Sequence, residues 1–323
     1  MALWYAGAYT ADMGGDADGI LALDSRPDGT LAVLGLTAAT PSPSYLAHGP
    51  DRLYAVSEAT GELVSFSRGV GFALHADATA PSGGEAPCHI GVYGSSIVVS
   101  NYTDGALGVL GTSPLALTQT LAGSGSGPRS VQEGPHAHST FEIGGAVLSA
   151  DLGADRVHVH SLVDGVLERG ASLALPPGTG PRDFLRHTNG DLYLLGELGL
   201  DVTVLRWAAG ELVAIGSVAL PGGAEGDHAA GLSLAGDYLY ATLRGSNRIS
   251  VLRVGTAGLE PVGFVSSEGD WPRHHAVEGT VLHVANQLSS EVASFSLGDD
   301  GLPVPLGITA VPSPTFLLRA ARF

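Results

Sequence analysis

Two series of polar side chains recur along the chain at similar intervals. Arginine binds anions with two parallel hydrogen bonds, whereas histidine and carboxylate groups accept and donate protons. If the fold brings the two series to one place, they would bind a small anion and carry out acid–base chemistry on it. The first series includes His136, Arg182, His228 and Arg273, and the second includes Glu58, Asn101, Asp151, Glu197, Arg244, Asn286 and Gln287.

An internal repeat sets the distances within each series. A small loop runs into an apolar segment seven times, with spacings of 44, 48, 46, 46, 45 and 42 residues. Seven units in 323 residues give about 46 residues per unit, which is typical of four short strands in one propeller blade. The units start at Pro43-Ser44-Tyr45-Leu46, Pro87-Cys88-His89-Ile90, Pro135-His136-Ala137-His138, Pro181-Arg182-Asp183-Phe184, Asp227-His228-Ala229-Ala230, Pro272-Arg273-His274-His275 and Pro314-Thr315-Phe316-Leu317.

The segments within each unit have the composition of short strands. Residues 192–195, 202–205 and 212–218 are apolar or alternating runs separated by turn residues. No stretch keeps a 3.6-residue period over about eleven positions, so helices are not expected. The sequence predicts an all-β fold, a seven-bladed β-propeller of four-stranded antiparallel blades, in a single domain of residues 1–323. A two-sheet sandwich is the main alternative, but it does not require seven equivalent starts.

The two ends of the chain supply complementary parts of one blade. Residues 314–323 provide only a first strand, whereas residues 3–9, 20–23 and 31–34 have the pattern of strands two to four. Pairing of the N- and C-terminal strands would close the ring and remove strand edges that promote aggregation.

This topology predicts where the polar side chains gather. Adjacent antiparallel strands reverse direction, so the first strand of a blade starts on the face where the second strand ends. Both polar series therefore lie on one face, around a central funnel suited to a small ligand. By this alignment, the equivalent inner positions are Ser44, Cys88, His136, Arg182, His228, Arg273 and Thr315.

Composition excludes several classes of function. The net charge of -17 opposes binding to nucleic acid phosphates and to anionic membrane surfaces. All fifteen basic residues are arginine, so lysine Schiff bases and P-loop lysines are excluded. The single cysteine, Cys88, allows no internal disulfide and fits a cytoplasmic protein. No apolar run is long enough for a membrane span, and the first residues lack the pattern of a signal peptide.

Common catalytic and metal-binding motifs are missing from the sequence. It contains no HExxH, no G-x-S-x-G and no CxxC. His158 and His160 alternate on one strand face, but two ligands without a third make a weak metal site. We therefore expect no metal and no cofactor.

Several motifs follow one another along the chain: Gly125-Ser126-Gly127-Pro128, Gln132, Pro135-His136-Ala137-His138-Ser139, Asp151-Leu152-Gly153-Ala154-Asp155, Gly180-Pro181-Arg182, Gly196-Glu197-Leu198, Leu243-Arg244-Gly245-Ser246-Asn247-Arg248 and Pro272-Arg273-His274. Taken in this order, they resemble the seven-bladed propeller lactonases. This family contains 6-phosphogluconolactonases and carboxy-cis,cis-muconate cyclases. The chain differs from the family pattern at Val131, Asp183 and Gly196, where Arg, His and Asn are frequent.

The resemblance implies a lactonase of carbohydrate metabolism, in the pentose phosphate pathway, acting on a sugar-phosphate lactone. It selects Glu197, His138 or His136, Arg182 and Arg244 as catalytic candidates. Glu197 or His138 would act as base, and Arg182 and Arg244 would bind the substrate anion and the developing oxyanion. This chemistry needs no metal. The expected substrate-binding residues are His136, Arg273, Asp151, Asn101 and Gln287.

Two other functions remain open at this point. One is cycloisomerase activity that forms a lactone from a carboxylated muconate. The other is a non-catalytic propeller that binds a protein partner, although such a surface would display aromatic and apolar side chains rather than these charged ones. The expected partner is a small anionic substrate.

Overall fold

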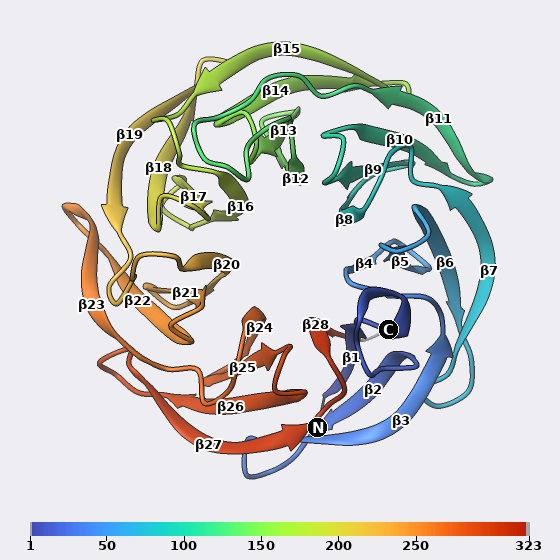
Figure 1. Ribbon diagram of the computed structural model, residues 1–323, viewed down its shortest axis with the longest axis vertical. Helices are drawn as coiled ribbons and strands as arrows, with labels where there is room; N and C mark the ends of the chain where they lie inside the picture. The colour runs from blue at the N-terminus through green and yellow to red at the C-terminus, as the bar shows by residue number, and fades with distance from the viewer. Residues whose placement is uncertain (1, 321–323) are drawn as a thin grey trace.

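The computed structural model describes residues 2–320 and confirms the predicted fold class. Seven four-stranded antiparallel sheets stand around a central axis, as the blades of a propeller (Figure 1). Residues 1 and 321–323 of the predicted 1–323 domain lie outside the described residues. The one short helix of the described chain is the 3-10 turn η1 (Ala11–Met13).

Six of the blades follow one another along the chain, each with its strands in sequence order from the axis outward. Their strands are β4 (Leu46–His48), β5 (Leu53–Ser57), β6 (Glu62–Arg68) and β7 (Leu74–Pro81); β8 (Pro87–Tyr93), β9 (Ser96–Asn101), β10 (Leu107–Thr112) and β11 (Leu115–Leu121); β12 (Ala137–Ile143), β13 (Ala146–Asp151), β14 (Arg156–Val163) and β15 (Val166–Ala174); β16 (Pro181–Arg186), β17 (Leu192–Gly196), β18 (Asp201–Ala208) and β19 (Glu211–Ala219); β20 (His228–Ala235), β21 (Tyr238–Arg244), β22 (Arg248–Gly255) and β23 (Gly258–Ser266); β24 (Pro272–Glu278), β25 (Val281–Asn286), β26 (Glu291–Leu297) and β27 (Pro303–Ala310).

The seventh blade joins the two ends of the chain, as predicted. Strand β28 (Pro314–Arg319) lies nearest the axis and pairs with β1 (Leu3–Ala8), which continues into β2 (Gly19–Ser25) and β3 (Leu31–Ala39). The C-terminal strand thereby completes a sheet whose other strands come from the N-terminus. Every blade then has a neighbouring blade on both sides (Figure 1).

The blades are held together by apolar side chains between adjacent sheets. One buried cluster joins Tyr5 and Phe316 of the closing blade to Leu46 and Phe66 of the next blade. Burial of such side chains contributes roughly 1.5–3 kcal/mol each. The fourth strands lie at the outer rim, where Ile308 of β27 is 55% exposed. The first three strands therefore carry most of the core and fix the positions of the loops around the axis.

A β-bulge near the start of the first strand recurs from blade to blade. In β16, Pro181 pairs with Gly196 and Asp183 pairs with Leu195, so Arg182 is left out of the ladder. A bulge re-aims the side chain of its extra residue and is common beside active sites. The residues skipped in the same way are Cys88, His138, Arg182, Arg273 and Thr315, and in β20 the pair Ala230 and Gly231.

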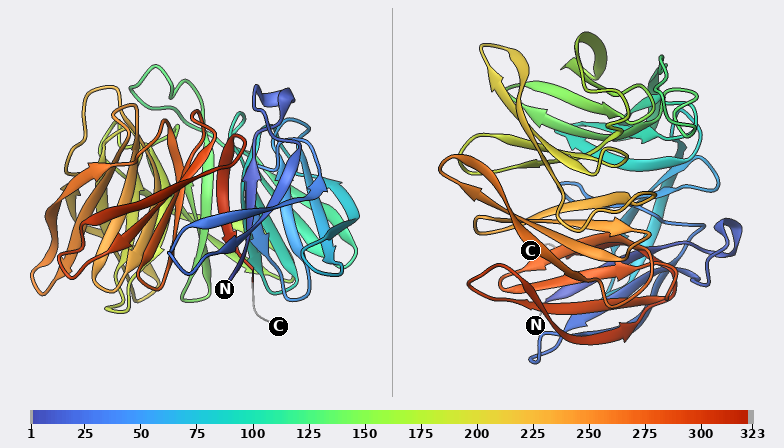
Figure 2. Two further views of the ribbon diagram at one scale, coloured as in Figure 1. Left: turned by 90° about the horizontal axis from the view of Figure 1, so that it is seen from below. Right: turned by 60° about the vertical axis from the view of Figure 1, so that its left-hand side comes forward.

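The two faces of the ring differ. The side view in Figure 2 shows η1 and the longer loops on one face and both chain termini on the other. The segment η1 directly follows β1, the second strand of its blade, so this loop-rich face is where second strands end. The bulged residues lie at the same end of the blades.

Candidate active site

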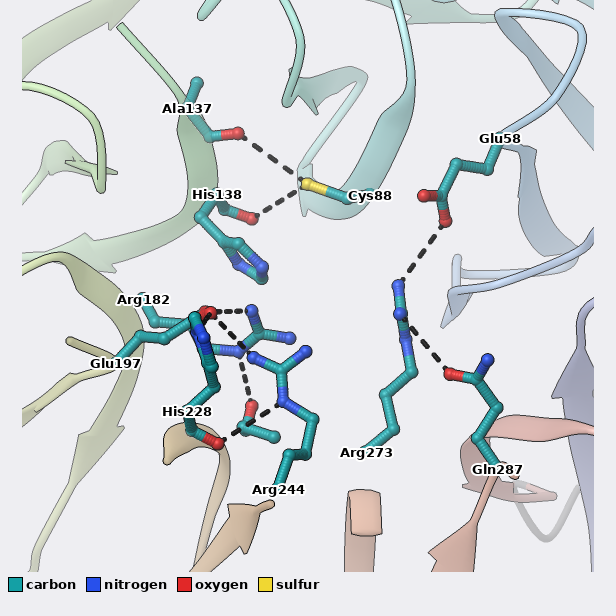
Figure 3. A network of polar contacts seen from close by, with 11 residues as sticks. Glu58, Cys88, Ala137, His138, Arg182, Glu197, His228, Arg244, Arg273 and Gln287 are labelled. Carbon is teal, nitrogen blue, oxygen red and sulfur yellow. Dashed lines mark hydrogen bonds and ion pairs between the residues drawn. The ribbon is translucent and has the colours of Figure 1, made fainter. Parts of the chain in front are cut away.

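The bulges form an inner ring of side chains at the mouth of the central channel. Its members from successive blades include Cys88, His138, Arg182 and Arg273, which face a common open space in Figure 3. Strand pairing thus explains why residues about one blade apart in the sequence converge.

The strand register corrects two of the predicted equivalences. His136 and His228 were predicted at the ring position, but the bulged residues are His138 and Ala230, two residues later. The prediction was wrong because it aligned Pro135 and Asp227 with the prolines that start other first strands. In these two blades alanine, Ala137 or Ala229, takes the place of the proline, and Pro135 and Asp227 precede the strands.

A second ring comes from the ends of the second strands. Glu197 directly follows β17 and Arg244 ends β21, so both side chains lie beside the bulges of their blades. In the other blades, the equivalent residue comes directly after the second-strand residue that pairs with the start of the first strand. These residues are Tyr9, Tyr102, Leu152 and Gln287, and Glu58 follows β5.

Glu197 binds three side chains at the mouth of the channel. Its Oε2 accepts a hydrogen bond from Nη1 of Arg182, and its Oε1 lies 2.7 Å from Nη2 of Arg244. Nδ1–H of His228 donates to the same Oε1 at 2.9 Å. The guanidinium Nε atoms donate to backbone carbonyls, Arg182 to Ala230 and Arg244 to His228. Glu197 therefore ties three neighbouring residues into one rigid unit (Figure 3).

The electrostatics of this unit keep Glu197 ionised. Burial alone would raise the pKa of its carboxyl, but Arg244 and Arg182 hold that pKa well below its usual range. The side chains of Glu197, Arg182 and Arg244 are 8–9% exposed, so the charges interact in a poorly solvated setting. Burial lowers the pKa of Arg244 to about 10, which still leaves it charged at neutral pH.

Each arginine keeps one terminal nitrogen free for a ligand. Among residues 2–320, neither Nη2 of Arg182 nor Nη1 of Arg244 has a hydrogen-bond partner. Two such donors side by side can bind a carboxylate, a phosphate or a carbonyl oxygen that gains negative charge.

His138 and Cys88 lie beside this unit. The imidazole of His138 projects toward Arg182 in Figure 3. Burial and the charge of Arg182 hold its pKa well below the usual range of histidine, so the ring is neutral. Burial also raises the pKa of the Cys88 thiol to about 12, and the thiol donates weakly to backbone carbonyls, including that of His138 at 3.5 Å. Cys88 is thus a protonated, unreactive member of the ring.

A second charged group lies across the open space. The guanidinium carbon of Arg273 lies 4.7 Å from the centre of the Tyr9 ring. Its Nη1 lies 3.5 Å from Oε1 of Gln287, and its Nη2 lies 3.6 Å from Oε2 of Glu58. The hydroxyl of Tyr9 donates to Oε1 of Glu58 at 2.9 Å, but the buried Oε2 has no hydrogen-bond partner among residues 2–320. This second charged group resembles the one around Glu197, but the contacts of its arginine with Gln287 and Glu58 are longer.

A cavity of about 220 Å³ is lined by one arginine of each group, Arg182 and Arg273. His138 and Cys88 also line it, together with aromatic side chains and further imidazoles. Asp183 is the single acidic residue of this lining. Burial raises the pKa of Asp183 to about 6, although Arg182 opposes the shift.

Three predicted substrate-binding residues make contacts within the protein. Asn101 is fully buried and donates to the Ala106 carbonyl at 3.1 Å. Asp151 accepts the backbone N–H of His136 at 2.8 Å. His136 itself stacks on Tyr102 at 4.5 Å and donates to its carbonyl. They support the loops around the cavity and are not among its lining residues.

Sequence reasoning missed three participants of this region. His228 was predicted in the inner ring but was not named as a catalytic or substrate-binding residue, and it binds Glu197; Tyr9 and Asp183 were not named as site residues. The signal for Tyr9 was its position after a second strand, equivalent to Glu197. The signal for Asp183 was its place next to the bulged Arg182.

Two features are absent from residues 2–320. No group of three or more His, Cys, Asp or Glu side chains is placed to hold a metal ion. No helix of this part of the chain is long and apolar enough to cross a membrane.

Comparison with known proteins identifies the family to which the chain belongs. A family model described as "Lactonase, 7-bladed beta-propeller" matches residues 3–318. The chain is 28% identical over 321 residues to a 6-phosphogluconolactonase of Bacillus subtilis, covering 90% of both chains. It is 27% identical over 284 residues to a 6-phosphogluconolactonase of Formosa agariphila, covering 78% of this chain and 80% of the relative. A solved structure of a periplasmic gluconolactonase from Pseudomonas aeruginosa superimposes with a TM-score of 0.91 at 26% identity, covering 99% of both chains.

Proposed function

Because the chain belongs to the lactonase family of seven-bladed β-propellers, we propose that it hydrolyses an anionic sugar lactone at the mouth of the central cavity. The observation that carries this proposal is the unit of Arg182, Glu197 and Arg244, with one free donor on each arginine. Ester hydrolysis needs preorganised positive charge where the carbonyl oxygen becomes an oxyanion. The two guanidinium groups provide that charge.

Glu197 acts in this proposal as a positioning residue. Both of its oxygens are bonded to cations or to His228, and its low pKa makes it a weak proton acceptor. Its function is to hold Arg182 and Arg244 in a fixed geometry before substrate arrives. Such preorganisation is the main source of electrostatic catalysis because no reorientation is needed during the reaction.

The second charged group suits the other end of the substrate. Arg273 lines the same cavity as Arg182 and lies across it, beside Gln287. We assign Arg273 and Gln287 to binding the anionic or hydroxyl-rich end of the lactone. The imidazole of His138, which is neutral and has no hydrogen-bond partner among residues 2–320, would bond to the ester end.

The names of the relatives support a sugar substrate. Two relatives are called 6-phosphogluconolactonase and one structural neighbour is called a gluconolactonase. We therefore propose a six-carbon aldonolactone carrying a phosphate, as in the pentose phosphate pathway. The arginines at the cavity match a phosphate dianion despite the acidic net charge of the protein.

The proposal includes a metal-independent reaction without a cofactor, because guanidinium groups supply the positive charge that a metal would otherwise provide. It also places the protein in the cytoplasm, where its single cysteine stays reduced. Nucleic acids and membranes are not proposed as partners.

Lactone formation from a carboxylated muconate is the second candidate, because the same arginines would bind its carboxylates. Product analysis by NMR distinguishes the two. Incubation with 6-phosphogluconolactone should give the open hydroxy acid faster than the uncatalysed rate, and 3-carboxymuconate should remain unchanged. Cyclisation of the muconate with no effect on the sugar lactone would overturn the proposed hydrolysis.

A further inference from the structure

The hydrolysis still lacks a proton acceptor. The carboxylate of Glu197 is bonded on both oxygens. The imidazole of His138 has a pKa held well below its usual range by burial and by Arg182, so it takes up a proton poorly. General-base catalysis is most efficient when the base titrates near the working pH. Neither predicted base meets this condition.

We infer that the carboxylate of Asp183 takes the proton from the water that attacks the lactone. This inference rests on the proposed lactone hydrolysis. It places the general base of that reaction in the cavity, next to Arg182. Asp183 directly follows Arg182 in β16, and both residues line the same cavity as His138 and Arg273. It is the acidic group of that cavity, and its carboxylate accepts the backbone N–H of Phe184 at 2.9 Å and that of Leu232.

Two histidines in the cavity are suited to hold the water. Nδ1 of His274 accepts the backbone N–H of Leu317 at 3.1 Å, and Nδ1 of His89 accepts that of Thr140 at 3.4 Å. Because a nitrogen that accepts a backbone N–H carries no proton of its own, each neutral ring keeps its proton on Nε2. Burial lowers the pKa of His89 to about 3 and that of His274 well below its usual range, so both rings stay neutral. Both line the cavity and can donate Nε2–H to a water oxygen.

The charge environment of Asp183 supports the same role. Burial raises its pKa to about 6, and Arg182 limits the rise. The carboxylate is therefore mostly ionised at neutral pH but can still accept a proton. The other titratable groups that line this cavity are Tyr45, Cys88, His89, His138, Arg182, Arg273 and His274. Of these, only the two arginines are charged at neutral pH, since the thiol, the phenol and the three imidazoles are neutral.

The proton balance of the step is complete without a co-reactant. As the water oxygen bonds to the carbonyl carbon, its proton passes to Asp183 and the carbonyl electron pair moves to the oxygen facing the arginines. When the tetrahedral intermediate collapses, the bond from carbon to the ring oxygen breaks, and the ring oxygen takes the proton from Asp183. The product is a hydroxy acid, which ionises at neutral pH and releases one proton to solvent.

The test compares Asp183→Asn with Asp164→Asn, an exposed turn aspartate with φ of 51°, a backbone conformation that asparagine tolerates. Removal of a general base costs about 10²–10⁴-fold in rate. We expect kcat of Asp183→Asn to fall by about that factor with little change in KM, while Asp164→Asn keeps the wild-type kcat. The wild-type kcat/KM should rise with pH along an acid limb near pH 6. That limb should be absent in Asp183→Asn and displaced in Asp183→His.

A chemical rescue separates a catalytic role from a structural one. In Asp183→Ala the cavity gains room for a small acid, so added formate should restore part of kcat, and chloride at equal ionic strength should not. Wild-type activity with unchanged kcat in Asp183→Asn, or an acid limb that stays in place in Asp183→His, would overturn this inference and leave the proposed function intact. If the wild type hydrolyses no lactone of a phosphorylated and unphosphorylated panel, the proposed function fails and this inference fails with it.

Discussion

Oε1 of Glu197 lies 2.7 Å from Nη2 of Arg244, although the two residues belong to adjacent blades and are separated by 47 positions in the sequence. The other carboxylate oxygen of Glu197 binds Arg182 of its own blade. One side chain thus holds both arginines together, and Arg182 lines the cavity. The catalytic geometry proposed for this protein depends on that single carboxylate.

Glu197→Gln should therefore lower both activity and stability. The amide keeps the shape but leaves two buried guanidinium groups without a counter-charge, and breaking such a pair costs about 3–5 kcal/mol of unfolding free energy. We expect a lower midpoint of denaturant unfolding and a fall in kcat/KM of at least about 100-fold. Glu260→Gln is the matched control, because its ion pair with Arg253 is about half exposed and should change stability by less than about 1 kcal/mol. Equal stability of the two variants would contradict the role given to Glu197.

Arg182 and Arg273 should have different kinetic effects. Arg182 faces the developing oxyanion in the proposed mechanism, so Arg182→Ala should cost about 2–4 kcal/mol of transition-state stabilisation, mainly in kcat. Arg273→Ala should mainly raise KM, and more for phosphorylated than for unphosphorylated lactones. Steady-state kinetics on a matched pair of lactones measures both effects. The assignment fails if Arg273→Ala lowers kcat as much as Arg182→Ala.

Asp183 should make stability depend on pH. Its pKa rises from 3.8 to about 6 in the folded protein, so the folded state binds the proton more tightly than the unfolded chain. The stability contributed by the protonated carboxyl is complete below about pH 4 and is lost as the pH rises through about 6, by up to about 3 kcal/mol. Asp183→Asn should thus raise the melting temperature at pH 7.5 relative to wild type, with a smaller difference at pH 4.5. A constant difference at both pH values would show that Asp183 does not titrate as described.

Closure by β28 predicts the effect of a truncation. Removal of residues 314–323 deletes the strand that pairs with β1. It also exposes the buried side chains of the closing blade that pack against Phe316 and Leu317. We expect loss of cooperative unfolding and aggregation, because an open sheet edge and core are exposed together. The full chain should unfold in one calorimetric transition if residues 1–323 form a single domain. A truncated protein with the full-length melting temperature would show that β28 is dispensable.

The repeat in the sequence was enough to predict the blades but not the exact alignment of every site residue. The starts with proline, such as Pro181 and Pro272, marked the bulged arginines correctly. In the blades with alanine at that position, the nearest proline or aspartate lay two residues earlier and shifted the alignment to His136 and His228. Local sequence carries no signal for a bulge in which two residues oppose one, because the extra residue is defined by the partner strand.

Side-chain roles were less predictable than strand positions. Asn101 and Asp151 end second strands as expected, yet they turn back to bond loop backbone groups. The need for glycine at position 196 was equally unpredictable from the sequence. A Cβ at this position would lie 2.2 Å from Oδ1 of Asp201, so glycine is required by a residue five positions later rather than by the site. Such contacts depend on packing between loops, which the repeat pattern does not contain.

The most direct test of the account is proton release in a pH-stat by the wild-type protein and by Arg182→Ala, after exhaustive chelation of metals. The substrates are phosphorylated and unphosphorylated aldonolactones, with the uncatalysed rate subtracted. The account predicts that the chelated wild type hydrolyses the phosphorylated lactone and that Arg182→Ala is slower by about 30–1,000-fold, which corresponds to about 2–4 kcal/mol. Activity lost on chelation and restored by one divalent ion, or a folded Arg182→Ala with wild-type turnover, would contradict it.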